Sequence, residues 1–343
     1  MVKVPVLIAS WLDIEQVERI AAAEPDRVEV VYEPSLLPAA TFEGDHHGPH
    51  RDLAPVELER WRAQVARAEV MFDFDWESGS DLLSRAPRLR WVQATSSGIG
   101  PLVRRLRLAE RQVRVTNAAG IHAQPLAEFV LLAVLHFTKE MPRLERWKAA
   151  RHWEKYCALE LPGTRMLVVG LGRVGRRVAE LASAFGIEVT GVRKSPGLPL
   201  PEGVARVIGP EELDAHLPGT DFLVLIAPAT EETARLLDAR RLGLLPERAV
   251  LVNIGRGSLV DEPALIDALR EGRLRGAALD VFEVEPLPAS SPLWDLPNVI
   301  VTPHSVSTVP LENERLVDLF IENLHRYLDG EPLLNDFDHA RGY

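Results

Sequence analysis

RMLVVGLGRVG, residues 165–175, is the stretch of sequence that decides the fold. The residues before its first glycine are mainly apolar and predict a short buried strand. Its glycines have the spacing G-x-G-x-x-G, and apolar side chains follow at helical spacing from Arg176 to Phe185. Strand, glycine loop and helix therefore occur in the order that a dinucleotide-binding chain requires.

Each glycine of this loop has its own predicted role. Gly170 permits a tight turn, Gly172 lets the backbone approach the pyrophosphate, and Gly175 allows the helix to pack closely on the strand. The phosphates would rest at the helix N-terminus, at Arg173 and Val174. An ordinary strand-to-helix turn is the alternative that the glycines alone leave open.

The end of the next predicted strand, residues 187–192, indicates which dinucleotide is bound. Chains that bind NAD carry Asp or Glu there, because a carboxylate accepts hydrogen bonds from the ribose hydroxyls. Arg193, Lys194 and Ser195 instead offer paired hydrogen bonds, a point charge and a hydroxyl to a 2′-phosphate. We therefore expect NADP(H) to be preferred, with NAD(H) possible; the alternative is a solvated cationic loop.

Length and composition limit the class of protein. A chain of 343 residues with 46% hydrophobic residues is expected to form two domains. Its net charge of −11 argues against a nucleic-acid partner and against an anionic membrane surface. No apolar run is long enough to span a bilayer, and residues 4–8 read as a strand and not as a signal peptide, so we expect a cytoplasmic protein.

The cysteine and histidine pattern predicts no metal site. Cys157 is the only cysteine, which excludes an intrachain disulfide and a cysteine zinc site. DHHGPHR at residues 45–51 looks superficially metal-binding, but Gly48 and Pro49 mark a loop. We expect this loop to be exposed to solvent.

The order of the elements predicts that one domain is inserted into another. Apolar strands alternate with amphipathic helices before residue 100, and the glycine loop begins only halfway along the chain. Later apolar runs read as parallel strands, separated by helices at residues 231–237 and 263–271. Residues 310–328 form an amphipathic helix that can pack back on the first domain.

The fold class follows from this order. We expect an α/β chain of two domains, with a doubly wound, parallel-sheet Rossmann cofactor domain at residues 116–303. It would be inserted into a smaller, flavodoxin-like α/β substrate domain at residues 1–115 and 304–343.

Further motifs stand at the ends of the later predicted strands. They are NIGRG at residues 253–257, DVFEVEPLP at 280–288 and TPH at 302–304. Together with the glycine loop they resemble the D-isomer-specific 2-hydroxyacid dehydrogenases, and Arg256, Glu285 and His304 are separated by 29 and 19 residues, which suits that family. The resemblance implies a two-domain architecture with catalysis in the cleft, and a homodimer joined through the cofactor domains.

The chemistry of reducing a 2-keto acid accounts for these residue types, because it needs a hydride, a proton donor and a cation for the carboxylate. His304 is suited to supply the proton. Glu285 can hydrogen-bond the other ring nitrogen, which fixes the tautomer and favours the imidazolium. Arg256 can hold carbonyl and carboxylate in one plane while polarising the C=O bond. Each residue alone also fits a surface loop or a turn.

The resemblance assigns further binding residues. It implies that Asp280 binds the nicotinamide carboxamide. It also implies that backbone amides of Ser97-Gly98-Ile99, chiefly those of Gly98 and Ile99, bind the substrate carboxylate; a simple turn is the alternative for this loop. The other residues expected at the cofactor are Pro228, Thr233 and Ile254.

Aromatic residues and one histidine leave open questions. Phe72, Phe74 and Trp76 lie near the pocket wall that the resemblance implies and would restrict the substrate to a small side chain, although such stripes more often belong to a core. His122 stands in the segment between the domains, where a hinge or interface contact is favoured over a second functional histidine.

The expected function is the reduction of a small 2-keto acid of the glyoxylate or hydroxypyruvate type by NADPH, reversible as a D-2-hydroxyacid dehydrogenase. Formate dehydrogenases resembling this family carry glutamine where Glu285 stands, which disfavours formate oxidation. Phosphoglycerate dehydrogenase is disfavoured because only a short segment follows His304. A dinucleotide-sensing corepressor, which can keep the same three residues, stays open as a reading from another class.

Overall fold

The computed structural model describes residues 2–46, 48–77 and 79–339 of the chain. The chain splits into two compact units. Unit 1 is Met1–Ile121 with Thr308–Tyr343, and unit 2 is His122–Ser307. Unit 2 is therefore an insertion in unit 1. Both crossings, the points where the chain passes from one unit to the other, lie a few residues after the expected ones, which were at 115/116 and 303/304.

Both differences have a structural cause. The first expected crossing would cut strand β5 (Arg114–Thr116), which pairs along its length with β4 (Trp91–Gln93) of unit 1. Beyond the second expected crossing, the backbone amides of Ser305 and Val306 donate hydrogen bonds to Asp280 of unit 2. A strand and a hydrogen-bonded loop each stay with the unit that satisfies their backbone groups.

Unit 1 is built around a sheet of five parallel strands in the order β2-β1-β3-β4-β5. The other strands are β1 Val4–Ile8, β2 Val28–Val31 and β3 Val70–Phe72. Its helices are α1 Ile14–Ala23, α2 Pro55–Arg67, α3 Leu82–Arg85, α4 Gly100–Arg105 and α11 Glu312–Asp329. Apolar runs form these strands because parallel sheets are covered on both faces.

Two hydrophobic clusters fill the two faces of this sheet. Trp61 of α2 and Leu82 of α3 belong to the cluster on one face. The other cluster includes Ile20 of α1, together with Phe72 and Phe320, whose rings meet edge to face with centroids 5.3 Å apart. The C-terminal helix α11 thus helps to cover the sheet of unit 1.

Unit 2 contains a sheet of seven parallel strands in the order β12-β11-β10-β9-β6-β7-β8. The strands are β6 Arg165–Val169, β7 Glu188–Val192, β8 Arg206–Ile208, β9 Phe222–Leu225, β10 Val250–Asn253, β11 Gly276–Leu279 and β12 Val299–Val301. The helices are α5 Ala123–Thr138, α6 Met141–Ala149, α7 Arg173–Ala184, α8 Leu213–His216, α9 Ala239–Leu242 and α10 Glu262–Arg270. The order of the strands reverses between β6 and β9, and open α/β sheets bind ligands at such a switch point.

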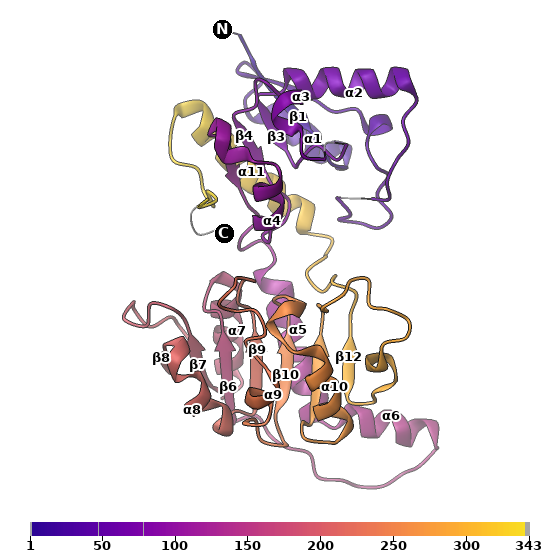
Figure 1. The fold of residues 1–343 in the computed structure, drawn as a ribbon, viewed down its shortest axis with the longest axis vertical. Helices are drawn as coiled ribbons and strands as arrows, with labels where there is room; N and C mark the ends of the chain where they lie inside the picture. Colours follow the sequence, from indigo (N-terminus) through magenta and orange to yellow (C-terminus); the bar gives the residue numbers. More distant parts are fainter. Residues whose placement is uncertain (1, 47, 78, 340–343) are drawn as a thin grey trace. The chain divides into compact units, whose positions relative to one another are not determined.

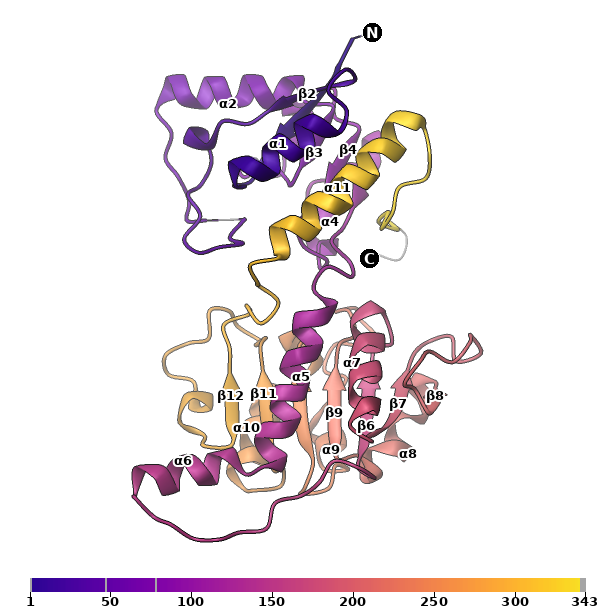
Figure 2. The ribbon, with the colours of Figure 1, turned by 180° about the vertical axis from the view of Figure 1, so that it is seen from behind.

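Helices cover both faces of the sheet of unit 2. Helices α8, α9 and α10 lie on the face toward the viewer in Figure 1. Helices α5 and α7 lie on the opposite face, which Figure 2 shows from behind. A separate hydrophobic cluster packs under each layer. The predicted class, a doubly wound parallel-sheet cofactor domain inserted into a smaller α/β domain, is confirmed.

The helix predicted at residues 231–237 was wrong. This segment forms turns, and its backbone amides bond to a neighbouring part of the chain. The amide of Arg235 donates to the carbonyl of Ser258 at 2.7 Å, and that of Leu237 donates to the carbonyl of Leu259 at 2.9 Å. A tertiary contact therefore overrides the local helical pattern.

In the part of the chain that the structure describes, no helix combines the length and the apolar character needed to cross a membrane. Among the same residues, no group of three or more His, Cys, Asp or Glu side chains is arranged to hold a metal ion. The side chain of Cys157 is exposed.

Candidate active site

The glycine loop follows β6 at the carboxyl edge of the sheet of unit 2. Gly170 has a φ of +108°, and a Cβ at this position would lie 2.8 Å from the backbone nitrogen of Ala227. Gly175 packs on Gly170 so closely that its Cβ would lie 2.1 Å from that residue's carbonyl oxygen. Beside Gly172 a Cβ would meet no atom within 4 Å, so this part of the loop has room for a pyrophosphate.

Helix α7 begins at Arg173, earlier than the Arg176 predicted from the sequence, with Gly172 as its N-cap. Arg173 and Val174 therefore lie in the first helical turn. Backbone N–H groups of a first turn have no partner within the helix and bind anions. The loop and the turn together fit the pyrophosphate of a dinucleotide.

The cations after β7 both have partners within the protein. Nη2 of Arg193 donates to the carbonyl oxygen of Pro199 at 3.1 Å and also to that of Leu198. Nζ of Lys194 lies 2.5 Å from Oε2 of Glu232, and its side chain is 63% exposed. Arg193 thus holds its own loop in place, whereas Lys194 is the more accessible of the two cations.

The sheet order brings the three predicted catalytic residues to one edge. Strands β10, β11 and β12 are neighbours, and the loops after their carboxyl ends carry Arg256, Glu285 and His304 respectively. Oε2 of Glu285 lies 2.7 Å from Nδ1 of His304. The hydrogen-bonded acid and histidine expected from the sequence are thus present in the structure.

Glu285 is held at both of its carboxylate oxygens. Oε1 accepts a hydrogen bond from the backbone N–H of Phe282 at 3.0 Å, while Oε2 contacts His304. The side chain of His304 is 45% exposed, and its backbone is left-handed, with a φ of +54°. The carboxylate therefore fixes Nδ1 of the imidazole, and Nε2 is the nitrogen left for a ligand.

Arg256 is positioned by the side chain of Asn253 at the end of β10. The amide nitrogen of Asn253 donates to the carbonyl of Arg256 at 3.0 Å, and its amide oxygen accepts from the backbone N–H of Gly255 at 3.1 Å. Gly257 lets this turn lie against the next loop, because a Cβ there would be 1.9 Å from the carbonyl carbon of Phe282. Burial lowers the pKa of Arg256, and the negative charge of Glu285 opposes this shift.

Asp280 is buried at the end of β11 and organises the loop that carries His304. Its Oδ1 accepts hydrogen bonds from Oγ1 of Thr302 at 2.8 Å and from the backbone N–H groups of Ser305 at 3.0 Å and Val306 at 3.4 Å. Burial raises the pKa of Asp280, and these hydrogen bonds oppose the rise. The resemblance implied a contact with nicotinamide; the structure adds this loop-holding contact.

In unit 1, the loop after β4 contains Ser97, Gly98 and Ile99. Ser97 and Gly98 are exposed, whereas Ile99 is buried and precedes α4. The loop is fixed just before Ser97, where Oγ1 of Thr95 donates to Oδ2 of Asp73 at 3.0 Å. Asp73 itself follows β3 in a left-handed conformation, with a φ of +67°.

Residues 131–306 match the family described as D-isomer specific 2-hydroxyacid dehydrogenase, NAD binding domain. A glyoxylate reductase from Aeropyrum pernix is 35% identical over 263 residues, which cover 73% of this chain and 77% of that protein. The chain belongs to the D-isomer-specific 2-hydroxyacid dehydrogenase family.

Solved structures of this dehydrogenase family have the same fold. A D-isomer specific 2-hydroxyacid dehydrogenase from Xanthobacter autotrophicus, in complex with NADPH and MES, has a TM-score of 0.80 at 31% identity, with 100% of both chains covered. An NADPH-dependent glyoxylate/hydroxypyruvate reductase from Sinorhizobium meliloti, in complex with NADP and sulfate, has a TM-score of 0.78 at 27% identity, covering 99% of this chain and 100% of that one. The predicted family, the oxidoreductase class and a nicotinamide dinucleotide as cofactor are confirmed.

The other residues predicted at the dehydrogenase cofactor site lie in unit 2. Pro228 and Thr233 belong to the turn after β9, where Oγ1 of Thr233 donates to the carbonyl of Pro228 at 2.6 Å. Ile254 is buried directly after β10, and Ser195 follows the two cations after β7. His122 stands at the N-cap position of α5 and is the first residue of unit 2.

The aromatic residues of unit 1 have separate roles. Phe72 is fully buried in the core, whereas Phe74 and Trp76 are half-buried. Trp76 packs near Trp61, with ring centroids 6.0 Å apart, and near His50 at 6.2 Å. Phe72 therefore cannot form part of a pocket wall.

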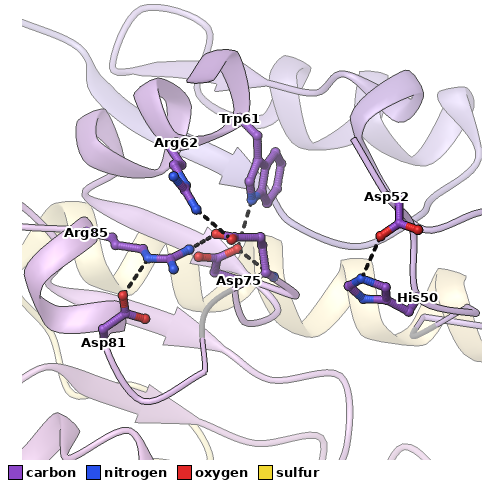
Figure 3. Close-up of polar contacts among 8 residues, drawn as sticks. His50, Asp52, Trp61, Arg62, Asp75, Asp81 and Arg85 are labelled. Carbon is purple, nitrogen blue, oxygen red and sulfur yellow. Dashed lines mark hydrogen bonds and ion pairs between the residues drawn. The ribbon is translucent and has the colours of Figure 1, made fainter. Parts of the chain in front are cut away.

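Figure 3 shows how the loop after β3 is tied to neighbouring helices. Nε1 of Trp61 on α2 donates to Oδ1 of Asp75 at 2.8 Å. Glu77 pairs with Arg62 of α2 at 2.9 Å and also with Arg85 of α3. These contacts fix the loop that contains Phe74.

The loop at residues 45–51 is less exposed than the sequence predicted. Asp45 is buried and His46 is half-buried, whereas Pro49 and His50 are exposed as predicted; His47 lies outside the described residues. Oδ2 of Asp45 accepts hydrogen bonds from the backbone N–H and the hydroxyl of Thr41, at 2.9 and 2.8 Å. A carboxylate that accepts hydrogen bonds from the backbone of a turn becomes buried against that turn. The presence of glycine and proline in the loop does not predict this burial.

Several residues that position the site were missed from the sequence. Asn253 and Thr302 lie inside the quoted motifs, yet their side chains act on the backbone of the loops and not on a ligand. Thr95 begins the loop, residues 95–100, that resembles the substrate-binding loop of the family, but its own role was not predicted; Asp73 lies in no motif. A short polar side chain at the end of a predicted strand, where it can bond to the backbone of a turn, is the only signal for such residues.

Proposed function

We propose that this protein is an NADPH-preferring reductase of small 2-keto acids of the glyoxylate and hydroxypyruvate type, and in reverse a D-2-hydroxyacid dehydrogenase. The observation that carries this proposal is the pair formed by Glu285 and His304, 2.7 Å apart, at the edge that also holds Arg256. A proton donor, its orienting carboxylate and a cation are the groups that this reduction requires.

The roles of the three residues follow from their contacts. A bound nicotinamide cofactor supplies the hydride. Nε2 of His304 gives a proton to the carbonyl oxygen of the substrate, because Glu285 engages Nδ1 and stabilises the imidazolium. The guanidinium of Arg256 binds the substrate carboxylate and polarises the carbonyl. The side chain of Asn253 holds the backbone of Arg256, and Nη1 of Arg256 donates to the carbonyl of Gly255 at 2.6 Å. For the loop of unit 1, the resemblance alone suggests that the backbone amides of Gly98 and Ile99 bind the substrate carboxylate.

The preference for NADPH rests on the residues after β7. Lys194 and Ser195 offer a cation and a hydroxyl to the 2′-phosphate. These positions hold no aspartate or glutamate that could bind the 2′-hydroxyl of an unphosphorylated ribose. Arg193 adds positive charge while its guanidinium keeps the loop in shape. The Xanthobacter and Sinorhizobium proteins were both solved with NADPH or NADP, which supports the same cofactor here.

We also propose that two copies associate through unit 2. Large apolar side chains are exposed on this unit: Trp153 is 96% exposed, Leu132 54% and Leu159 50%. The segment that carries Trp153 and Leu159 is tied to the end of α5 by the hydroxyl of Tyr156, which donates to the carbonyl of Lys139 at 3.1 Å. Light scattering should give the mass of a dimer, and Trp153→Asp should give the mass of a monomer.

The test of the function is a set of steady-state assays with 2-keto acids and both cofactors. Rapid oxidation of NADPH with glyoxylate or hydroxypyruvate, and slower oxidation of NADH, is the expected result. Formate and 3-phosphoglycerate with NADP⁺ or NAD⁺ serve as the rival substrates. Tight dinucleotide binding with no turnover of any 2-keto acid would instead favour a dinucleotide-sensing corepressor.

A further inference from the structure

The ion pair between Lys194 and Glu232 spans the switch point of the sheet in unit 2. Lys194 follows β7, and Glu232 lies in the turn after β9. In the sheet, β6 pairs with β7 on one side and with β9 on the other. The pair therefore joins two loops across the carboxyl end of β6, where the glycine loop begins.

The dimensions of a sheet agree with this arrangement. Adjacent strands lie about 4.8 Å apart, so β7 and β9 are separated by roughly 10 Å. An extended lysine and an extended glutamate together cover that span, and their charged atoms lie 2.5 Å apart. Because dinucleotides bind outside the carboxyl ends of the strands at the switch point, the pair lies across the place where the adenosine half would enter.

We propose that this pair is a latch over the cofactor site, and that Glu232 is a residue that determines cofactor specificity. The 2′-phosphate replaces Glu232 as the partner of Lys194 and opens the latch, whereas NADH has no group that can do so. This inference rests on the proposed binding of the adenosine half beside Lys194. In this proposal Glu232 contributes to the selection of the cofactor, in addition to the contribution of the cations.

Two features of the structure and the charge of the phosphate support an exchange of partners. Lys194 and Glu232 are 63% and 68% exposed, and an exposed ion pair is weak and readily broken. A phosphate carries close to two negative charges near neutral pH, so it competes well with a single carboxylate. The guanidinium of Arg193 cannot replace Lys194 as the partner of the phosphate, because it donates to the carbonyls of Leu198 and Pro199.

The experiment measures binding of two fragments of the cofactor to the full chain by titration calorimetry. The fragment 2′,5′-ADP carries the 2′-phosphate, and 5′-AMP lacks it. Glu232→Gln removes the competing charge at constant size, so it should tighten 2′,5′-ADP about threefold and leave 5′-AMP unchanged. Glu231→Gln is the matched control, because it makes the same change of charge at the neighbouring exposed residue.

The second half of the experiment repeats Glu232→Gln in a chain that carries Lys194→Met. The effect of Glu232→Gln should then disappear, because a latch requires both partners. The latch is wrong if the effect persists without Lys194, or if Glu231→Gln tightens 2′,5′-ADP as much as Glu232→Gln. The proposed NADPH preference is tested separately, because it fails if the wild type binds 2′,5′-ADP and 5′-AMP equally. In that case the latch is still tested by whether the effect of Glu232→Gln depends on Lys194.

Discussion

The carboxyl edges of the two sheets have the same architecture but use polar residues differently. In unit 2, side chains from the loops after β11 and β12 contact each other, in the 2.7 Å pair of Glu285 and His304. In unit 1, the buried carboxylate of Asp73 bonds instead to its own loops, through the backbone N–H of Phe74 at 2.9 Å and the hydroxyl of Thr95 at 3.0 Å.

This difference separates two kinds of contribution to activity. Residues at the edge of unit 2 carry the groups that we propose to move a proton and bind the substrate carboxylate, so changing them should affect turnover. The carboxylate at the edge of unit 1 only fixes the shape of a loop, so changing its partner should affect the binding of the keto acid and leave the cofactor unaffected.

The largest effect is expected at His304. His304→Ala removes the proton donor, and general acid catalysis contributes about 10²–10⁴-fold to a rate, so kcat should fall by that amount while the Kd for NADPH stays nearly unchanged. His325→Ala is the matched control, because His325 also pairs with a glutamate, Glu24, at 2.8 Å, but in unit 1. A kcat that His304→Ala leaves intact would exclude this residue from the chemistry.

The next largest effect concerns the cofactor. Arg193→Asp combined with Lys194→Ala removes the positive charge beside the proposed 2′-phosphate. One charge-assisted contact from Lys194, with the added charge of Arg193, corresponds to a preference of about ten- to a hundredfold. KM for NADPH should rise, kcat at saturation should be largely kept, and NADH should be used better. The measurement is kcat/KM for both cofactors at low and high salt, since salt screens exposed charges.

A control for this pair is Arg104→Asp with Arg105→Ala, which makes the same change of charge at exposed positions on α4 of unit 1. The cofactor assignment fails if the wild type already prefers NADH, or if the Arg193 and Lys194 variant keeps the NADPH preference of the wild type.

Glu285→Gln is expected to act on the pH profile. Glutamine keeps a hydrogen bond to Nδ1 of His304 but removes the negative charge that stabilises the imidazolium. The upper pH limit for keto-acid reduction should therefore move to lower pH, which a series of kcat measurements across pH will detect. Glu24→Gln, at the other glutamate and histidine pair, should leave the profile in place; an unmoved profile for Glu285→Gln would remove this residue from the mechanism.

A smaller effect is expected in unit 1. Thr95→Val keeps the shape of the side chain and removes the hydroxyl that bonds to the buried carboxylate of Asp73. KM for the keto acid should rise several-fold, with KM for NADPH unchanged. Thr41→Val removes a similar bond, to Asp45, from another loop of unit 1 and should alter neither constant; equal effects of the two variants would mean that the loop after β4 has no special role.

The sequence was a good guide to the edge of unit 2, because the signals there are local. Apolar runs predict strands, and the glycine spacing predicts a loop between strand and helix whatever the rest of the chain does. The pairing of Glu285 with His304 could be predicted from the resemblance and from the requirement that parallel strands end at one edge of a sheet. The structure then supplied the distance.

The sequence was a poor guide wherever distant segments decide the conformation. Residues 231–237 have helical spacing, but the amides of Arg235 and Leu237 bond to residues 258 and 259. The short strand β8 was not predicted, because its pairing with β7 decides its conformation. Arg193 appeared free to bind a phosphate, yet it donates to carbonyls of its own loop. The first two differences come from contacts between segments that are distant in the sequence. Arg193 instead contacts carbonyls five and six residues along the chain, through a loop conformation that residue types alone do not predict.

The smallest expected effect is on stability, and it concerns Asp280. Burial raises the pKa of this carboxyl above the 3.8 of an unperturbed aspartate, so the folded state binds a proton more readily than the unfolded state. The free energy of unfolding that this group contributes therefore decreases as pH rises above about 4, through the window between the two pKa values.

Asp280→Asn removes that dependence while its amide oxygen still accepts hydrogen bonds from Thr302 and Ser305. Relative to the wild type, the variant should become more stable as the pH is raised from about 4 to neutrality, which thermal unfolding at both pH values will measure. Asp295→Asn, at an exposed carboxyl of the same unit, is the control and should show no such trend. A variant that loses stability at neutral pH would show that the charge of Asp280, and not only its hydrogen bonds, holds the loop of His304.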